Sequence, residues 1–197
     1  MTVNITEAKA FMKDYFEKLY KKLESEAPIL LKRPGLPEEM TVEGTKDGDG
    51  WSVWKLVPSS VTDNDIASEE EEVGLKFPNL LKAFIGTYHH CFDKFGSNLL
   101  DDPFKALDNA FNPQLTANNY LPFAWDKEGY FIRCIDLSAD PDGDNCPVVQ
   151  FDHERLFDML YDYEDNDGAA PREELEELAE QIADSFEAYL NDFLTEI

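Results

Sequence analysis

The chain has 197 residues, of which 43% are hydrophobic and 13% aromatic, and it carries a formal net charge of −25. This apolar content excludes a disordered chain, and the length favours one domain spanning residues 1–197. The charge excludes nucleic acid and anionic membranes as preferred partners, because an acidic surface repels their phosphates.

A first helix is predicted over residues 4–27. Asn4 followed by Glu7 is typical of a capping box at a helix start. Apolar residues then keep helical spacing from Ile5 to Leu23, until a proline interrupts the pattern.

A loop and a hairpin are predicted next. Residues 30–39 contain two prolines and a glycine and are interpreted as a loop, while residues 40–57 are interpreted as two strands around a Gly-Asp turn. Trp51, Trp54 and Trp125 are expected in the core, since burial is the commonest use of a large aromatic side chain.

The stretch "EEEEVGLKFPNLLKAF" predicts an αα corner. Ile66, Glu70 and Val73 share one helical face, and Gly74 supplies the residue that ends a helix. Pro78 then lies where a second helix begins. The run of four acids is expected on a solvated helix face.

Strands and a last helix complete the prediction. Residues 91–119 are expected to be rich in loops, with a short helix over 104–110. An antiparallel meander is predicted from three strands, at 120–125, 130–137 and 147–151. A long helix is predicted over 171–196, with an apolar stripe formed by Leu175, Leu178, Ile182, Phe186, Tyr189 and Phe193. Helices around an antiparallel, twisted sheet indicate an α+β fold.

No catalytic, metal or cofactor site is predicted, and the protein is expected not to be an enzyme. The sequence contains no nucleophile elbow, phosphate-binding loop or zinc-binding helix motif. Residues 140–151 and 163–174 resemble calcium loops, but each lacks obligatory ligands and is interpreted as a solvated turn. His89, His90 and His153 are not spaced to converge on a metal ion.

The cysteines and the first residues predict a location in the cytoplasm. Cys91, Cys134 and Cys146 are odd in number and form no C-x-x-C pair, so neither a disulfide framework nor a zinc site is expected. The start of the chain lacks the apolar segment of a signal peptide, and no stretch is apolar enough to span a bilayer.

Two parts of the chain carry a family pattern. An Ile, an acid, a Gly, an apolar residue, a Pro and an apolar helix are present as Ile66, Glu70, Gly74, Phe77, Pro78, Leu81 and Phe84. Downstream, "LPFAWDKEGYFIRCIDLS" has a strand, an Asp/Gly turn and a strand ending in Asp, and "CPVVQFDHE" has a further strand. Together these stretches, within residues 51–160, resemble the SUKH superfamily of Smi/Knr-type cell-wall assembly regulators and bacterial immunity proteins.

The resemblance implies a function in binding. Immunity proteins of this kind neutralise a toxin, which is frequently a nuclease. Residues 59–197 hold eight Lys/Arg and thirty-two Asp/Glu, and the resulting net charge of −24 attracts a basic protein. Solubility alone also explains such charge. A regulatory scaffold for endogenous proteins and a calcium-responsive module are the alternatives. Since loops beside a sheet are well placed for recognition, the expected partner contacts are Asp101, Asp102, Asp126, Glu128, Asp140, Asp142 and Asp144.

Overall fold

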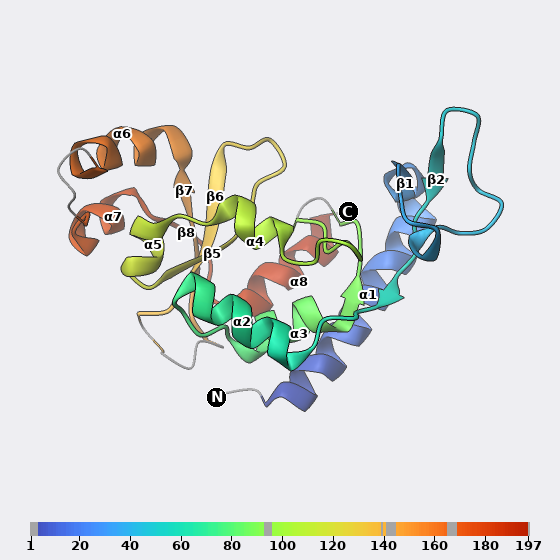
Figure 1. Ribbon diagram of the computed structural model, residues 1–197, viewed down its shortest axis with the longest axis horizontal. Coiled ribbons are helices and arrows are strands. Elements are labelled where there is room, and N and C mark those ends of the chain that lie inside the picture. The colour runs from blue at the N-terminus through green and yellow to red at the C-terminus, as the bar shows by residue number, and fades with distance from the viewer. Residues whose placement is uncertain (1–3, 93–95, 139, 141–144, 165–168, 197) are drawn as a thin grey trace.

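The computed structural model describes residues 4–92, 96–138, 140, 145–164 and 169–196 and confirms an α+β fold (Figure 1). Its elements in chain order are α1 (Ile5–Glu26), the 3-10 turn η1 (Pro28–Leu31), β1 (Lys32–Pro34), the 3-10 turn η2 (Glu38–Met40), β2 (Trp51–Val53), β3 (Val57–Pro58), α2 (Asp63–Val73), α3 (Asn79–Thr87), β4 (Tyr88–His89), α4 (Lys105–Ala110), α5 (Pro113–Ala117), β5 (Tyr120–Trp125), β6 (Phe131–Asp136), β7 (Val148–Asp152), α6 (His153–Glu164), α7 (Arg172–Leu178), β8 (Glu180–Ala183) and α8 (Phe186–Glu196). Among these described residues, no helix combines the length and the apolar character needed to cross a membrane.

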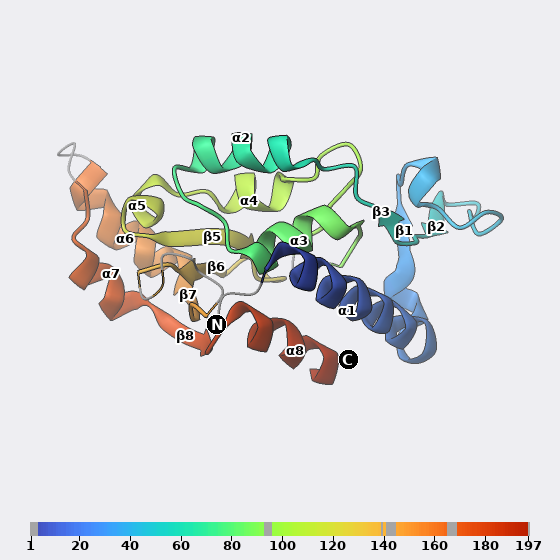
Figure 2. The same cartoon turned by 90° about the horizontal axis from the view of Figure 1, so that it is seen from below.

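The predicted first helix is confirmed as α1. The side chain of Asn4 accepts hydrogen bonds from the backbone N–H groups of Thr6 and Glu7, as expected of an N-cap. The buried face of α1 comprises Ala8, Met12, Tyr15, Phe16, Leu19 and Leu23. This face packs on α3, and α8 lies alongside α1, with the Tyr15 hydroxyl donating to the Leu190 carbonyl at 2.9 Å (Figure 2).

The αα corner is also confirmed. α2 ends at Gly74, whose φ of 78° is left-handed, and the Gly74 N–H donates to the carbonyl of Glu70. Pro78 is the N-cap of α3. Thr62 and Asp65 form a reciprocal capping box at the start of α2, which the sequence interpretation did not identify.

The main sheet is antiparallel, with strand order β5-β6-β7-β8. The three predicted strands are confirmed, and β8 is an addition at the edge of β7. Two short pairs lie apart from this sheet, β1 with β2 and β3 with β4. Side chains alternate across the sheet, so that Ile135 belongs to one hydrophobic cluster and Cys134 to another. Both faces of the sheet are therefore covered.

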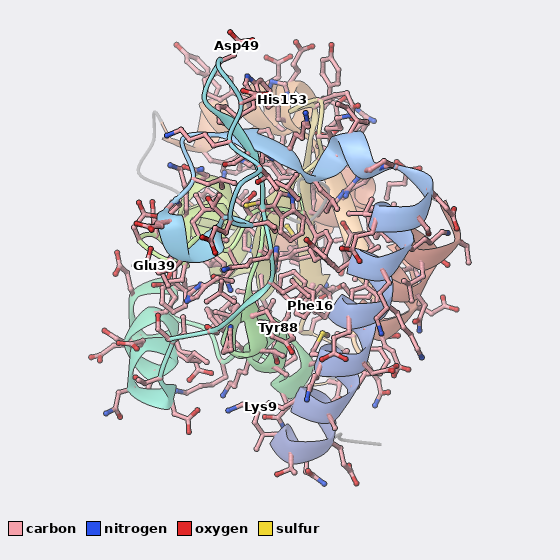
Figure 3. All side chains as sticks on the ribbon, turned by 90° about the vertical axis from the view of Figure 1, so that its right-hand side faces the viewer. Lys9, Phe16, Glu39, Asp49, Tyr88 and His153 are labelled. Atoms are coloured by element: carbon pink, nitrogen blue, oxygen red, sulfur yellow. The ribbon has the colours of Figure 1, made fainter. Side chains whose placement is uncertain are left out.

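The two clusters divide the helices between them. The larger cluster joins α1, α3 and α8 to one face of the sheet and includes the fully buried Phe16 and Trp54. Figure 3 labels Phe16, which projects from α1. The smaller cluster joins α6 and α7 to the other face through Phe151, Leu156 and Leu175.

The predicted helix over residues 171–196 is wrong. The chain instead forms α7, the strand β8 and then α8, because the edge of β7 presents backbone groups that β8 satisfies, with Val149 opposite Gln181. Ser185 starts α8 by accepting a hydrogen bond from the N–H of Ala188. The apolar spacing expected of one helix is shared by all three elements.

The loop prediction for residues 30–39 is also wrong in part. β1 lies there and pairs with β2, while the strand expected before the turn is reduced to a bridge between Thr41 and Trp54. Trp54 is fully buried as expected and Trp125 is half-buried, but 43% of Trp51 is exposed. Pairing with β1 places Trp51 opposite Pro34 at a sheet edge, which leaves the indole in solvent.

The predicted short helix over 104–110 is confirmed as α4, whereas α5 and α6 were not predicted. α5 begins with Asn112 as N-cap and Pro113 at the first helical position. α6 begins after Asp152, whose carboxylate accepts hydrogen bonds from the N–H groups of Glu154 and Arg155.

Candidate partner interface

The turn between β5 and β6 holds two of the expected partner contacts. The Asp126 carboxylate accepts hydrogen bonds from the N–H groups of Tyr130 at 2.6 Å and Phe131 at 2.8 Å. Gly129 closes the turn with a φ of 76°. Asp126 thus stabilises the turn itself, and the exposed Glu128 is the acid that the turn presents to solvent.

Two further expected contacts precede α4. Asp101 is exposed, whereas Asp102 is half-buried and lies 3.9 Å from the ammonium of Lys105. An ion pair of this kind between exposed side chains contributes little to stability, so both acids remain available to a partner.

The last three expected contacts fall in the connection between β6 and β7. The Asp140 carbonyl accepts a hydrogen bond from the Cys146 thiol at 3.2 Å, while Asp142 and Asp144 lie outside the described residues. This connection and the β5–β6 turn are at opposite ends of β6, a strand of six residues that spans roughly 20 Å (Figure 1). The expected contacts therefore do not form one patch.

The end of the sheet with the β5–β6 turn also carries exposed aromatic side chains. Tyr130 is 59% exposed in the turn, and on the adjoining α6 Phe157 is 64% exposed and Tyr161 is 57% exposed. His153, Phe157 and Tyr161 are successive positions four residues apart, so they follow one face of α6. Single exposed aromatics are ordinary, but a row of them is an unusual surface.

Contacts with neighbouring segments fix the position of His153, the first residue of this row. The His153 Nδ1 donates to the Tyr130 carbonyl at 3.1 Å, and the rings of His153 and Trp125 meet edge to face at 5.6 Å. The Trp125 indole N–H in turn donates to the Asn109 carbonyl at 2.8 Å. His153 is labelled near the upper edge of Figure 3, and α6, which it starts, lies at the opposite end of the long axis from β1 and β2 (Figure 1).

Sequence reasoning missed this surface, although a signal for it exists. α6 buries Leu156 and Leu160 and exposes Phe157 and Tyr161, which lie about 100° further round the helix. A surface helix normally has one apolar stripe. Apolar residues outside that stripe indicate a second contact, and they would have been found had residues 153–164 been interpreted as a helix.

The acid of the family pattern closes the αα corner. The side chain of Glu70 is 4% exposed, and its carboxylate accepts hydrogen bonds from the Phe77 N–H at 2.9 Å and the Lys76 ammonium at 2.7 Å. The Lys82 ammonium lies 2.7 Å from Oε1, the oxygen that also accepts from the Phe77 N–H. Burial raises the pKa of Glu70, but these hydrogen bonds outweigh it and hold the pKa below its ordinary value.

The other pattern residues support the same corner. Gly74 and Pro78 end and start its helices, and the apolar members are buried, namely Ile66, Phe77, Leu81 and Phe84. The pattern is structural, since it builds the corner and exposes only Gly74.

The run of four acids at the corner is only partly solvated. Glu71 and Glu72 are exposed as expected, but Glu70 is buried and Glu69 is half-buried. Burial, with the nearby carboxylates of Asp108 and Glu72, raises the pKa of Glu69 to about 7. Glu69 of α2 and Asp108 of α4 thus place two carboxyl groups together in a small pocket between the helices, which Val73 and Leu107 also line.

His89 in β4 and His90, which follows it, have structural roles. The His89 Nε2 accepts from the Ser60 N–H at 3.0 Å, and its Nδ1 donates to the Asn98 side-chain carbonyl at 2.8 Å. His90 packs against the rings of Phe16, Phe84 and Phe92. Within the described ranges no group of three or more His, Cys, Asp or Glu side chains is placed to hold a metal ion.

The acid that ends β6 connects the sheet to α7. The Asp136 carboxylate accepts hydrogen bonds from the Arg172 guanidinium at 2.8 Å and 3.0 Å. The same guanidinium lies over the Tyr120 ring, 4.5 Å from its centroid, and donates to the Asn118 carbonyl. Like Glu70, this family-pattern acid therefore has a structural role.

The chain was compared with known proteins. A family model, described as the SMI1 / KNR4 family (SUKH-1), matches residues 60–192, from just before α2 into α8. The searches of curated proteins and of solved structures gave no match. Since the matched range is well over half of the chain and contains both the corner and the main sheet, the chain belongs to the SMI1/KNR4 family (SUKH-1).

Proposed function

We propose that this protein is a non-enzymatic immunity protein, which neutralises a basic toxin domain by binding it. Membership of the SMI1/KNR4 family supports an immunity or regulatory role exercised through contact with other proteins. Neither role requires a cofactor or a metal ion. A toxin of the nuclease type fits the proposal, because a protein that binds phosphates is usually basic.

The observation that carries the immunity role is the charge of residues 59–197, which include the family region. Residues 59–197 have a net charge of −24, whereas residues 1–58 hold nine Lys/Arg and ten Asp/Glu, a net of −1. Complementary charge speeds the encounter of two proteins and suppresses wrong partners. Fast capture is what a protective protein needs, because an active toxin does damage until it is bound.

Among the expected contacts we favour the end of the sheet with the β5–β6 turn. Glu128 is exposed there, and Asp126 shapes the turn that presents it. Asp101 and Asp102 precede α4, which packs on β5, so they are a secondary set. Asp140, with Asp142 and Asp144 outside the described residues, belongs to the opposite end and serves in long-range attraction.

The test is protection of cells against a toxin. The toxin domain encoded beside this protein's gene is expressed alone and together with the protein, and both the survival of the cells and the mass of the purified complex are measured. We expect survival and a stable complex. The cytoplasm is the expected compartment, so the protein is expressed without an export signal.

The regulatory scaffold is the second candidate, supported by the same family membership. A cell in which no neighbouring gene encodes a toxin, and in which deleting the protein alters cell-wall assembly, would favour it. Protection without a complex, or turnover of a nucleotide, ester or glycoside by the pure protein, would contradict both candidates, since both act by binding.

A further inference from the structure

The surface formed by Tyr130, His153, Phe157 and Tyr161, which we name the aromatic row, has a defined chemical character. Three of its side chains are more than half exposed, at 59%, 64% and 57% for Tyr130, Phe157 and Tyr161. Successive positions on α6 are separated by about 6 Å along the helix axis. The rings thus offer separate faces to a partner and do not shield one another.

Carboxylates follow the rings along the same helix. Glu154 and Asp158 each come directly after a ring position and are exposed, so they form a parallel line of negative charge beside the aromatic row. Residues 126–130 and 152–161 together contain five acids and two bases, a net of −3. The surface therefore combines aromatic faces with negative charge.

One side chain suits both features at once. An arginine guanidinium stacks on an aromatic face and also donates paired hydrogen bonds to a carboxylate, whereas a lysine ammonium is a compact, strongly hydrated charge. The chain uses this chemistry internally, where the Arg172 guanidinium lies over the Tyr120 ring and binds Asp136.

From this combination we infer that the aromatic row is the docking surface for an arginine-bearing face of a basic protein. The inference rests on the proposed function, because it names the surface that would hold the toxin. A second copy of the chain does not fit, since each copy carries a net charge of −25 and copies repel one another. An anionic lipid surface is disfavoured by the same repulsion.

Neighbouring residues hold the aromatic row in a fixed arrangement before it binds a partner. Asp152 caps α6, Leu156 and Leu160 bury its inner side, and the contact between His153 and the Tyr130 carbonyl joins the helix to the turn. A surface that is ordered before binding loses less conformational entropy when it binds.

The experiment compares an oligoarginine and an oligolysine peptide of equal length as probes, at physiological salt. We expect the wild-type protein to bind oligoarginine about three- to tenfold more tightly, which is the size expected of a few exposed cation–π contacts. Nuclear magnetic resonance should place the largest backbone amide shifts at Tyr130 and residues 153–161.

Leucine variants separate stacking from apolar contact. Phe157→Leu and Tyr161→Leu keep an apolar side chain but remove the aromatic face, and because both positions are more than half exposed the variants should melt like the wild type. Each should reduce the preference for arginine, and together they should abolish it. Trp51→Leu, which removes an exposed ring from β2, is the matched control and should leave the preference unchanged.

Several results would overturn the inference. These are equal affinity for the two peptides, an arginine preference that survives in the double leucine variant or is lost in Trp51→Leu, or shifts centred on another surface. A dimer seen by sedimentation and lost on Phe157→Glu would show that the row pairs with a second copy.

The peptide assay and the toxin assay fail independently. If the arginine preference depends on Phe157 and Tyr161 but no toxin is neutralised, the docking surface is supported and the immunity role is contradicted. If the double leucine variant binds a toxin as tightly as the wild type does, the immunity role is supported and the inference about the aromatic row is contradicted.

Discussion

Glu70 is a residue whose surroundings require its negative charge. Its carboxylate is buried between Lys76, Lys82 and the Phe77 N–H. We expect Glu70→Gln to lower the free energy of unfolding by about 2–3 kcal/mol, because the amide leaves the lysines without their counter-charge. Urea unfolding at pH 7 measures this loss.

The neighbouring acid provides the control. Glu71 is exposed on the same turn of α2, so Glu71→Gln should change the free energy of unfolding by less than about 0.5 kcal/mol. Equal effects of the two substitutions would mean that the corner does not depend on a buried charge.

His90 makes stability depend on pH. Burial, with a smaller contribution from His89, lowers the pKa of His90 to about 3 from an ordinary 6.5. Above pH 6.5 the imidazole is neutral in both the folded and the unfolded chain; as pH falls below 6.5 only the unfolded chain takes up the proton. Stability is therefore lost progressively between pH 6.5 and pH 3, by about 2 kcal/mol at pH 5.

His90→Phe tests this dependence, since the site is lined by phenylalanine rings. The free energy of unfolding of each protein is measured by urea at pH 7 and at pH 5, and the variant should lose about 2 kcal/mol less than the wild type. A variant with an unchanged difference between the two pH values would show that His90 becomes protonated in the folded chain.

At the scale of elements, the close approach of α4 to the preceding segment depends on Gly96. Gly96 has a φ of 79°, and a Cβ placed on it would lie 2.4 Å from the Cβ of Ala106. Gly96→Ala should therefore destabilise the fold by about 2–3 kcal/mol, through both backbone strain and overlap. Thermal unfolding gives a direct measure.

Gly44 separates these two causes. It has a similar φ of 76° but no neighbouring atom within 4 Å of an added Cβ. Gly44→Ala should thus show the strain alone, about 1 kcal/mol. If Gly96→Ala cost no more than Gly44→Ala, α4 would have room to move away.

The sequence predicts those elements whose signals are local. Gly74 and Pro78 fix the corner by backbone preference, and the run from Tyr120 to Trp125 has the composition of a strand. Residues 171–196 were misinterpreted because an apolar spacing of three and four also fits a helix, strand and helix in succession. What selects β8 is the free edge of β7, a partner about thirty residues away that a local pattern does not contain.

The candidate site was less predictable for the same reason. Sequence reasoning named loop acids, and Glu128 does lie exposed beside the aromatic row. It could not show that Asp140 and the β5–β6 turn lie at opposite ends of β6, since that depends on how the strands pair. It also had no means of distinguishing the exposed Phe157 from the buried Leu156 without placing α6 on the sheet.

For the molecule as a whole, the net charge should control how fast a basic partner is captured. We expect the association rate with the captured toxin to fall as ionic strength rises, with little change in the dissociation rate, because long-range attraction is screened by salt. Stopped-flow mixing across a salt series gives both rates. Rates that are flat with salt would mean that the acidity serves solubility alone.

Two triple variants locate the effect. We expect the combination of Glu128→Gln, Glu154→Gln and Asp158→Asn to slow association more than the combination of Asp140→Asn, Asp142→Asn and Asp144→Asn, because the first set lies beside the proposed docking surface. Equal slowing would indicate a diffuse field, and a larger effect of the second set would move the interface to the other end of the sheet.

The pairing of α1 with α8 has a consequence for how the protein is made. The hydrogen bond from Tyr15 to Leu190 joins residues 175 positions apart, and the Lys22 ammonium reaches the Leu194 carbonyl in the same way. During synthesis α1 leaves the ribosome before residues 186–196, so the apolar face that it shares with α3 is covered only after α8 has been made. Until α8 has been made, the apolar side chains of α1 and α3 lack the cover that Phe186 and Leu190 provide, and exposed apolar surface of this kind is a target for chaperones.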